Sequence, residues 1–304
     1  MNRQLRHVIV TRFNLKSQVW RTTKNNEPLQ TQAWLRHRFE LFEQYCLPSV
    51  QNQTNQNFEW FVYFDTETPP EFLSKINHYA KSYGNFKPVF LEDIELLKPH
   101  IKAHLQQNTQ TPYLLTTRLD NDDSLHQTFV QTINDCAQNQ ISHANNAPET
   151  PLLIDVTHGF MLDTQPKMLL GNCKMPFNPF MSLLEAVEPN KKPITIYHQN
   201  QEHWIAHPNC LKIANKRLWL QVIHEKNKLN KFSPSSLNPN LSQLTNFGIA
   251  PQNIAEPQKW LGFVQENAIV RQKTLVLNLK IWGKKMYYKT TWLLRCLKKQ
   301  NINT

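Results

Sequence analysis

The chain has 304 residues, a formal net charge of +11, and apolar and aromatic contents of 40% and 11%. This length predicts one large or two modest domains, and the composition is sufficient for a substantial core. Only six glycines are present, and the sequence contains neither Gly-x-Gly-x-x-Gly nor Gly-x-x-x-x-Gly-Lys-Ser/Thr. These absences disfavour Rossmann dehydrogenases and P-loop enzymes.

The first half of the chain alternates strand-like and helix-like segments. β-branched and aromatic runs predict strands at residues 7–11, 58–64, 87–91 and 113–119. Helical spacing of apolar residues predicts helices at 35–47, 71–82 and 94–108, the first ending or kinking at Pro48. This alternation predicts an α/β fold with a mostly parallel central sheet and helices on both faces.

The second half gives weaker signals. We expect a helix at residues 125–139 and strands at 152–161, 193–198 and 218–223. Residues 232–257 are rich in Asn, Ser, Pro and Gln, which is typical of a loop or a lid.

The five cysteines are scattered and form no Cys-x-x-Cys pair, which is typical of reduced, cytosolic cysteines. The N-terminus lacks a signal-peptide pattern, and no apolar run approaches the about 18 residues of a membrane-spanning helix. We therefore expect a cytoplasmic protein.

A strand-like run ends in three closely spaced carboxylates, Asp120, Asp122 and Asp123. Like charges this close raise each other's pKa, and a bound divalent cation removes that repulsion. Carboxylate oxygens suit Mg²⁺ or Mn²⁺, although Asp-Asn-Asp-Asp is also good turn chemistry. Asp65 likewise follows a predicted strand, and ligands of open α/β sheets bind at the carboxyl ends of strands.

Several stretches in this half resemble family 2 glycosyltransferases. Residues 47–54 and 57–65 are similar to the family's first helix and next strand, and Leu-Asp-Asn-Asp-Asp at 119–123 looks like its metal and diphosphate motif. Residues 38–43 and 117–123 look closer to the rhamnosyltransferase group of these enzymes. Phe-Asp-Thr-Glu at 64–67 stands where the family usually has Asp-Asp-Gly-Ser. The supporting motifs lie between residues 7 and 124.

The resemblance implies a GT-A domain over residues 1–262, with a nucleotide-sugar-binding half (1–124) and an acceptor half (125–262). It implies a metal-dependent and inverting transfer of a sugar from a nucleoside-diphosphate donor to a glycan or lipid-linked acceptor of the cell envelope. Rhamnose is the sugar suggested by the narrower group.

The resemblance also implies roles for individual residues. The nucleotide-sugar donor would be contacted by Thr11, Arg12, Asp65, Arg118 and Asp120. The Mn²⁺ or Mg²⁺ ion would be held by Asp122, Asp123 and His224, although a lone histidine beside a strand is more often structural. Catalysis is assigned to Asp120 and Asp122, with Glu202 as the first choice of base and Glu185 as the second.

Positive charge is concentrated near the C-terminus. Residues 263–304 predict a basic amphipathic helical extension, which either packs on the domain or lies on an anionic membrane surface at the inner face of the membrane. The remainder of the chain is close to charge balance, so we expect no nucleic-acid partner.

Two other functions remain open from the sequence. One is a catalytically inactive GT-A-like binding protein, which would bind a donor without turning it over. The other is a metal-dependent phosphoesterase that uses the same aspartates, which would cleave phosphodiesters.

Overall fold

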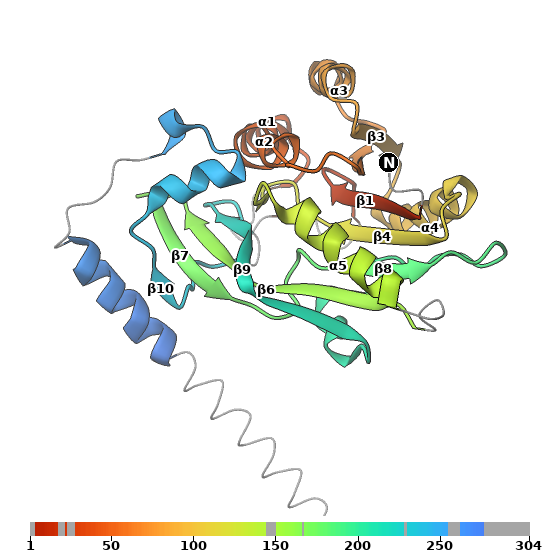
Figure 1. The fold of residues 1–304 in the computed structure, drawn as a ribbon. Coiled ribbons are helices and arrows are strands. Elements are labelled where there is room, and N and C mark those ends of the chain that lie inside the picture. The colour runs from red at the N-terminus through yellow and green to blue at the C-terminus, as the bar shows by residue number, and fades with distance from the viewer. Residues whose placement is uncertain are drawn as a thin grey trace, which may run out of the picture.

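Figure 1 shows the fold in the computed structural model, which describes residues 4–17, 22, 28–143, 150–165, 167–227, 230–254 and 262–276. The described strands form one 10-stranded sheet. Its main path has the order β10-β7-β6-β8-β4-β1-β2-β3, and β9 pairs with both β5 and β6.

The first four strands are parallel, so their carboxyl ends lie at the same edge of the sheet. They are β1 (Leu5–Arg12), β2 (Glu59–Asp65), β3 (Phe86–Leu91) and β4 (Tyr113–Arg118). Val10 pairs with Phe61 of β2 and with Arg118 of β4. This register brings the residues that follow β1, β2 and β4 to one edge of the sheet.

Helices cover both faces of this parallel half. One face packs against α1 (Gln32–Leu41), α3 (Pro70–Ser82) and α5 (Phe129–His143). The other face packs against α4 (Leu97–Asn108) and the short helix η3 (Gln201–Ala206). A short turn, η2 (Ile94–Leu96), precedes α4. The predicted α/β class is confirmed, as are the four predicted strands of the first half.

The first helix does not end at Pro48. After α1 the chain passes through a π-helical segment, η1 (Phe42–Cys46), and continues as α2 (Leu47–Gln51). The Leu47 N–H reaches back to the Phe42 carbonyl, which is five residues away instead of four. Pro48 has no N–H to donate, and the wider turn before it lets the helix continue.

The second half of the sheet is mixed rather than parallel. β8 (Ser182–Ala186) is antiparallel to β4, and β6 (Leu152–Asp163) is antiparallel to β8 and to β7 (Leu169–Lys174). β10 (Ser236–Leu237) adds to β7, and the long β9 (Cys210–Ile223) runs parallel to β6. The short connection between β6 and β7 allows only antiparallel pairing, because parallel neighbours need a long crossover.

Two predictions for this half were wrong, and a third was partly right. The helix expected from residue 125 starts only at Phe129, because β5 (Ser124–Leu125) pairs with β9. Residues 193–198 form no strand, since their N–H groups bond to side chains instead of a neighbouring strand. Residues 232–254 are irregular, as expected of a loop, but they pack on the sheet and form no open lid, with η4 (Leu241–Phe247) and η5 (Pro251–Asn253) following β10. Residues 255–257 lie outside the described part of the chain.

A helix over residues 262–276 lies beside β10 (Figure 1). The Asn267 side-chain oxygen accepts the Leu237 N–H at 2.9 Å, and the Thr274 hydroxyl donates to the Pro234 carbonyl at 2.7 Å. In the part of the chain that is described, no helix has the length and hydropathy needed to cross a bilayer. The rest of the predicted basic extension, residues 277–304, lies outside the described residues.

Candidate active site

The connection from β4 to β5 places four polar side chains at the carboxyl edge of the sheet. Asn121, Asp122 and Asp123 are buried, whereas the Asp120 side chain is 27% exposed. Each side chain has partners from other parts of the chain. The predicted acidic cluster is therefore a mostly buried, hydrogen-bonded group of side chains at the strand ends and not a solvated turn.

The Asp122 carboxylate is the point where three separate elements meet. Its Oδ2 accepts from Nη1 of Arg38 in α1 at 3.0 Å and lies 3.1 Å from Nε2 of His224, which follows β9. The Asn227 amide nitrogen lies 3.5 Å from the same oxygen. Burial alone would raise the pKa of Asp122, but Arg38 and His224 outweigh it and hold that pKa well below its usual value.

Arg38 also reaches the neighbouring amide. Its Nη2 donates to Oδ1 of Asn121, and the Asn121 amide in turn donates to the Phe13 carbonyl at 3.0 Å. The guanidinium fork therefore ties α1 to the β4–β5 connection at two points, a geometry that arginine provides and lysine does not.

Asp120 is held by the two other arginines of the site. Arg118 Nη2 lies 3.2 Å from Asp120 Oδ2, and Arg12 Nη2 lies 3.6 Å from Asp120 Oδ1. Burial raises the pKa of Asp120, but Arg118 and then Arg12 outweigh burial, so that pKa is lowered. Arg118 in addition stacks on Tyr197, with its guanidinium carbon 5.9 Å from the ring centroid.

Asp123 is the acid of the cluster with a raised pKa. Its Oδ1 accepts the backbone N–H of Val222 in β9 at 2.9 Å. Burial, followed by the neighbouring charges of Asp122 and Asp120, raises the pKa of Asp123 well above its usual value. Asp123 thus fastens β9 beside the site, and its environment disfavours a negative charge.

Asp65 ends β2 at the same edge and is buried. Its Oδ1 accepts the Glu67 N–H at 2.8 Å, and its Oδ2 accepts the Lys16 N–H at 3.3 Å. The Thr11 side chain is fully buried and its hydroxyl accepts the Trp60 indole N–H at 2.9 Å, so the hydroxyl contributes to packing. Its expected contact with the nucleotide-sugar stays a prediction.

The two candidate bases lie in different places. Glu202 belongs to η3, but its side chain is outside the described part of the structure. Glu185 pairs with Leu114 at the start of β4, about 20 Å from the acidic cluster at the rise of a strand. Glu185 is therefore not a base for this site.

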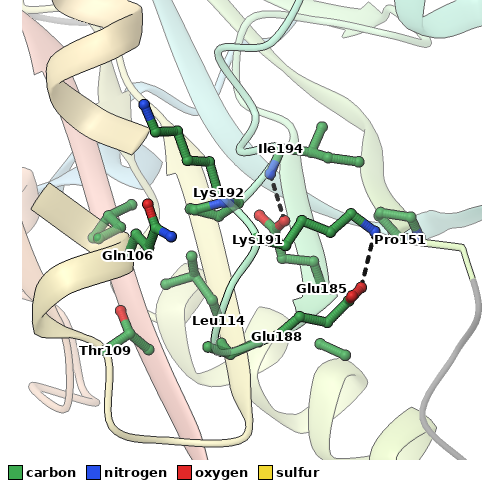
Figure 2. Close-up of a pocket in the computed structure, with 13 residues that line it drawn as sticks. Gln106, Thr109, Leu114, Pro151, Glu185, Glu188, Lys191, Lys192 and Ile194 are labelled. Carbon is green, nitrogen blue, oxygen red and sulfur yellow. Dashed lines mark hydrogen bonds and ion pairs between the residues drawn. The ribbon is translucent and has the colours of Figure 1, made fainter. Parts of the chain in front are cut away.

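Glu185 instead belongs to a small cavity of about 110 Å³ at the opposite edge of the sheet. Figure 2 shows its carboxylate accepting the Ile194 N–H, at 2.6 Å. The second oxygen accepts the Thr195 N–H at 2.9 Å, and Lys191 pairs with Glu188 nearby. Burial raises the pKa of Glu185, and these backbone donors oppose the rise.

The donor set does not fit the expected cation as it stands. Among the residues that the structure describes, no three His, Cys, Asp or Glu side chains gather as a group that could hold a metal ion. Asp122 and His224 are brought together as expected, but the oxygen between them is already bonded to Arg38. A cation that used this same oxygen, Oδ2, would have to displace the guanidinium. The assignments of Asp122, Asp123 and His224 to a metal therefore stay predictions.

Arg38 is the site residue that sequence reasoning missed. It lies on the polar side of an amphipathic helix, where a charged residue is normally solvated, so helical periodicity gave no signal for it. Its place in a stretch similar to the rhamnosyltransferase group was the one available indication.

The sequence matches a protein family, and the fold has similarities among solved structures. The family model described as "Putative rhamnosyl transferase" matches residues 6–235, and no curated protein matches the sequence. Among solved structures, S. aureus TarS 1–349 is 13% identical with a TM-score of 0.38, covering 72% of this chain and 60% of that one. The same fragment in complex with UDP-GlcNAc is 14% identical, with a TM-score of 0.39 and coverages of 76% and 62%.

A Desulfovibrio desulfuricans structure titled "putative nucleotide-diphospho-sugar transferase" is 9% identical with a TM-score of 0.39, covering 90% of this chain and 99% of that one. This chain spans about three fifths of the TarS fragment. TM-scores this low do not establish a shared function with these proteins. The family match spans most of the sequence, and this chain belongs to the rhamnosyl transferase family that the match defines.

Proposed function

We propose that this protein transfers a sugar from a nucleoside-diphosphate donor, which binds at the carboxyl edge of β1, β2 and β4. The observation that carries the proposal is the meeting of Arg12, Arg38 and Arg118 with the acidic cluster at this edge. The residues come from two strands, a helix and a loop, so the fold and not the local sequence assembles them. Family membership supports the same reaction class.

The chemistry is a displacement at the anomeric carbon. A bond forms from an acceptor hydroxyl oxygen to that carbon, the bond to the diphosphate oxygen breaks, and the hydroxyl proton goes to a base. The leaving diphosphate gains charge, which guanidinium groups stabilise because they donate two parallel hydrogen bonds to phosphate oxygens. We assign Arg12 and Arg118 to the diphosphate. We assign Asp65 to an N–H group of the nucleobase or a hydroxyl group of the ribose.

The finer assignments rest on family membership or on the sequence. Rhamnose is the proposed sugar because of the family's description. An inverting outcome, Glu202 as the base, and a glycan or lipid-linked acceptor are proposed from the resemblance. The expected divalent cation, Mn²⁺ or Mg²⁺, also remains a prediction.

A peripheral contact with the inner membrane face is part of the proposal. The helix over residues 262–276 exposes Val264, Ile269 and Leu275, and it carries Arg271 and Lys273. Exposed apolar side chains beside basic ones favour an anionic lipid surface. Sedimentation with vesicles containing phosphatidylglycerol, compared with neutral vesicles, tests this contact, and equal binding to both would contradict it.

The direct test of the transferase proposal is donor cleavage. Purified protein is incubated with dTDP-, UDP- and GDP-sugars, with Mn²⁺ or with EDTA, and the released nucleoside diphosphate is quantified. We expect one donor class to be cleaved and Asp122→Asn to abolish cleavage, whereas Asp135→Asn, an exposed acid in α5, has no effect. Nucleotide binding without turnover in the presence of acceptors would instead indicate a binding protein, and phosphodiester cleavage would indicate a phosphoesterase.

A further inference from the structure

Three arginines surround the acidic cluster, and together they leave an unusual set of unused donors. The Nε atoms of Arg12, Arg38 and Arg118 are all buried and have no hydrogen-bond partner within the described part of the chain. A buried N–H without a partner is energetically disfavoured, so three at one edge call for an explanation. A ligand with several acceptor oxygens would satisfy such donors.

Arg38 lies where a divalent cation bound to Oδ2 of Asp122 would lie. It bonds to Oδ2 of Asp122, the same oxygen that His224 and Asn227 approach. Its second nitrogen holds the side-chain oxygen of Asn121. A permanent positive charge is thus already bound to Oδ2 of Asp122 and Oδ1 of Asn121, two of the oxygen atoms that a metal ion at this place would use.

The fold holds Arg38 in this position. α1 begins with the Thr31 hydroxyl accepting the Trp34 N–H at 3.2 Å, and its apolar side buries Leu35 and Phe39 in the core. The Arg38 guanidinium carbon lies 5.7 Å from the Trp34 ring centroid, one helical turn away. A guanidinium on a packed helix is pre-organised, so it stabilises charge without first being ordered.

Formal charges at the site lead to the same conclusion. Asp120 is paired with Arg12 and Arg118, and Asp122 is paired with Arg38, so both carboxylates already have positive partners without an imported ion. Each guanidinium carries five N–H donors, and the contacts to the aspartates use only part of them. Arg12, whose side chain is 34% exposed, is the arginine of the three that a phosphate group can reach most easily.

We propose that Arg38 takes the place of the divalent cation beside Asp122, so that this protein binds and cleaves its nucleoside-diphosphate donor without a metal ion. The inference rests on the proposed function for the identity of the ligand. It concerns this chain's own residues, because Arg38, Asn121 and Asp122 form the unit that substitutes for the ion.

The test measures Mn²⁺ and nucleotide binding separately. Protein stripped with EDTA is titrated with Mn²⁺ and followed by electron paramagnetic resonance, then titrated with dTDP and UDP by calorimetry in EDTA or in Mn²⁺. Three proteins are compared: wild type, Arg38→Gln, and Arg36→Gln as a matched control. Arg36 lies two residues earlier in α1 and is exposed, with a single long contact to Glu71.

For the wild type we expect no saturable Mn²⁺ binding below about 1 mM and nucleotide affinity that changes less than about twofold with EDTA. Arg38→Gln should lose about tenfold or more in nucleotide affinity in EDTA and regain part of it with Mn²⁺, because the vacated position then admits the ion. Arg36→Gln should behave as the wild type. Far-UV circular dichroism melts establish that each variant is folded.

Saturable wild-type Mn²⁺ binding that Asp122→Asn removes would overturn the inference, as would a loss of nucleotide affinity of about tenfold in EDTA. The absence of nucleotide binding would separate this inference from the proposed function. If dTDP, UDP and GDP, titrated in the same way, all fail to bind under any condition, the proposed function fails, while the Mn²⁺ titration of wild type and Arg38→Gln still decides whether the arginine excludes the ion.

Discussion

Nε2 of His224 lies 3.1 Å from Oδ2 of Asp122, although 102 residues separate the two in sequence. This contact joins the end of β9 to the loop after β4, and so connects the later part of the sheet to the acidic cluster. It also orients the carboxylate that Arg38 holds from the other side.

We expect His224→Ala to lower the turnover number for donor cleavage about 10- to 100-fold, because Asp122 loses one of the groups that orient it. Folding should be retained, since Arg38 still pairs with Asp122. Steady-state kinetics with the preferred donor measure the change, and His143→Ala, an exposed histidine at the end of α5, is the control. Unchanged turnover in His224→Ala would show that the contact is incidental to catalysis.

Thr11→Val separates packing from ligand binding. Valine has nearly the shape of threonine but offers no acceptor to the Trp60 indole N–H, which becomes a buried donor without a partner. We expect the free energy of unfolding to fall by about 1–3 kcal/mol and nucleotide affinity to remain unchanged. Urea denaturation and calorimetry measure the two quantities, with Thr54→Val, an exposed threonine, as the control. A loss of nucleotide affinity without a loss of stability would show that Thr11 contacts the nucleotide-sugar.

His7 makes the stability of the fold depend on pH. Its ring is buried, Nε2 lies 2.8 Å from the Thr117 hydroxyl, and burial lowers the pKa of His7 to about 3. Below pH 6.5 the unfolded chain takes up a proton that the native state refuses, so stability is lost as the pH falls. The loss from this residue amounts to about 1.4 kcal/mol per pH unit between its unfolded and folded pKa values.

Urea unfolding of the wild type and of His7→Gln at pH 7.5 and pH 5.5 checks this expectation. The wild type should lose more stability than His7→Gln on acidification, by about 1.4 kcal/mol. His78→Gln, an exposed histidine in α3, should keep the wild-type pH dependence. The same loss in the wild type and in His7→Gln would mean that His7 titrates alike in both states.

Gly159 is required by the close packing of β6 against Trp219. A Cβ at this position would lie 2.1 Å from a ring atom of Trp219, whose indole donates to the Val156 carbonyl and whose ring stacks on Phe180. The ring has no free side to move toward, so we expect Gly159→Ala to cost about 1–3 kcal/mol of stability. Gly84→Ala, where an added Cβ meets no atom within 4 Å, is the control in the same denaturation assay. Equal stability of the two variants would contradict this account.

The parts of the fold that sequence predicted best are those with local causes. The strands at residues 7–11 and 113–119 were found because β-branched and apolar runs reflect burial in a parallel sheet. The Ile-Thr-Ile-Tyr run at 194–197 has the same composition but is no strand, because Glu185 and Thr116 take its N–H groups. No local property of that run indicates partners 10 and 80 residues away.

The site shows the same division. Asp120, Asp122 and Asp123 were identified because they are adjacent in sequence and follow a predicted strand. Arg38 bonds to Asp122 across 84 residues, and only the packing of α1 on the sheet brings the two together. The sequence therefore located the acidic side of the site, whereas its basic side depends on the tertiary structure.

The unbroken hydrogen bonding from β3 through β10 has a consequence for how this chain can be divided. β4 pairs with β1 on one side and with β8, contributed by a segment more than 60 positions later, on the other. In a fragment that stops after Ser124, one edge of β4 would have unpaired peptide N–H and C=O groups. Such an edge favours pairing between copies of the fragment. The acidic cluster after β4 and the later strands therefore belong to one sheet, and exchanging either half for that of a relative would require new pairing between β4 and β8.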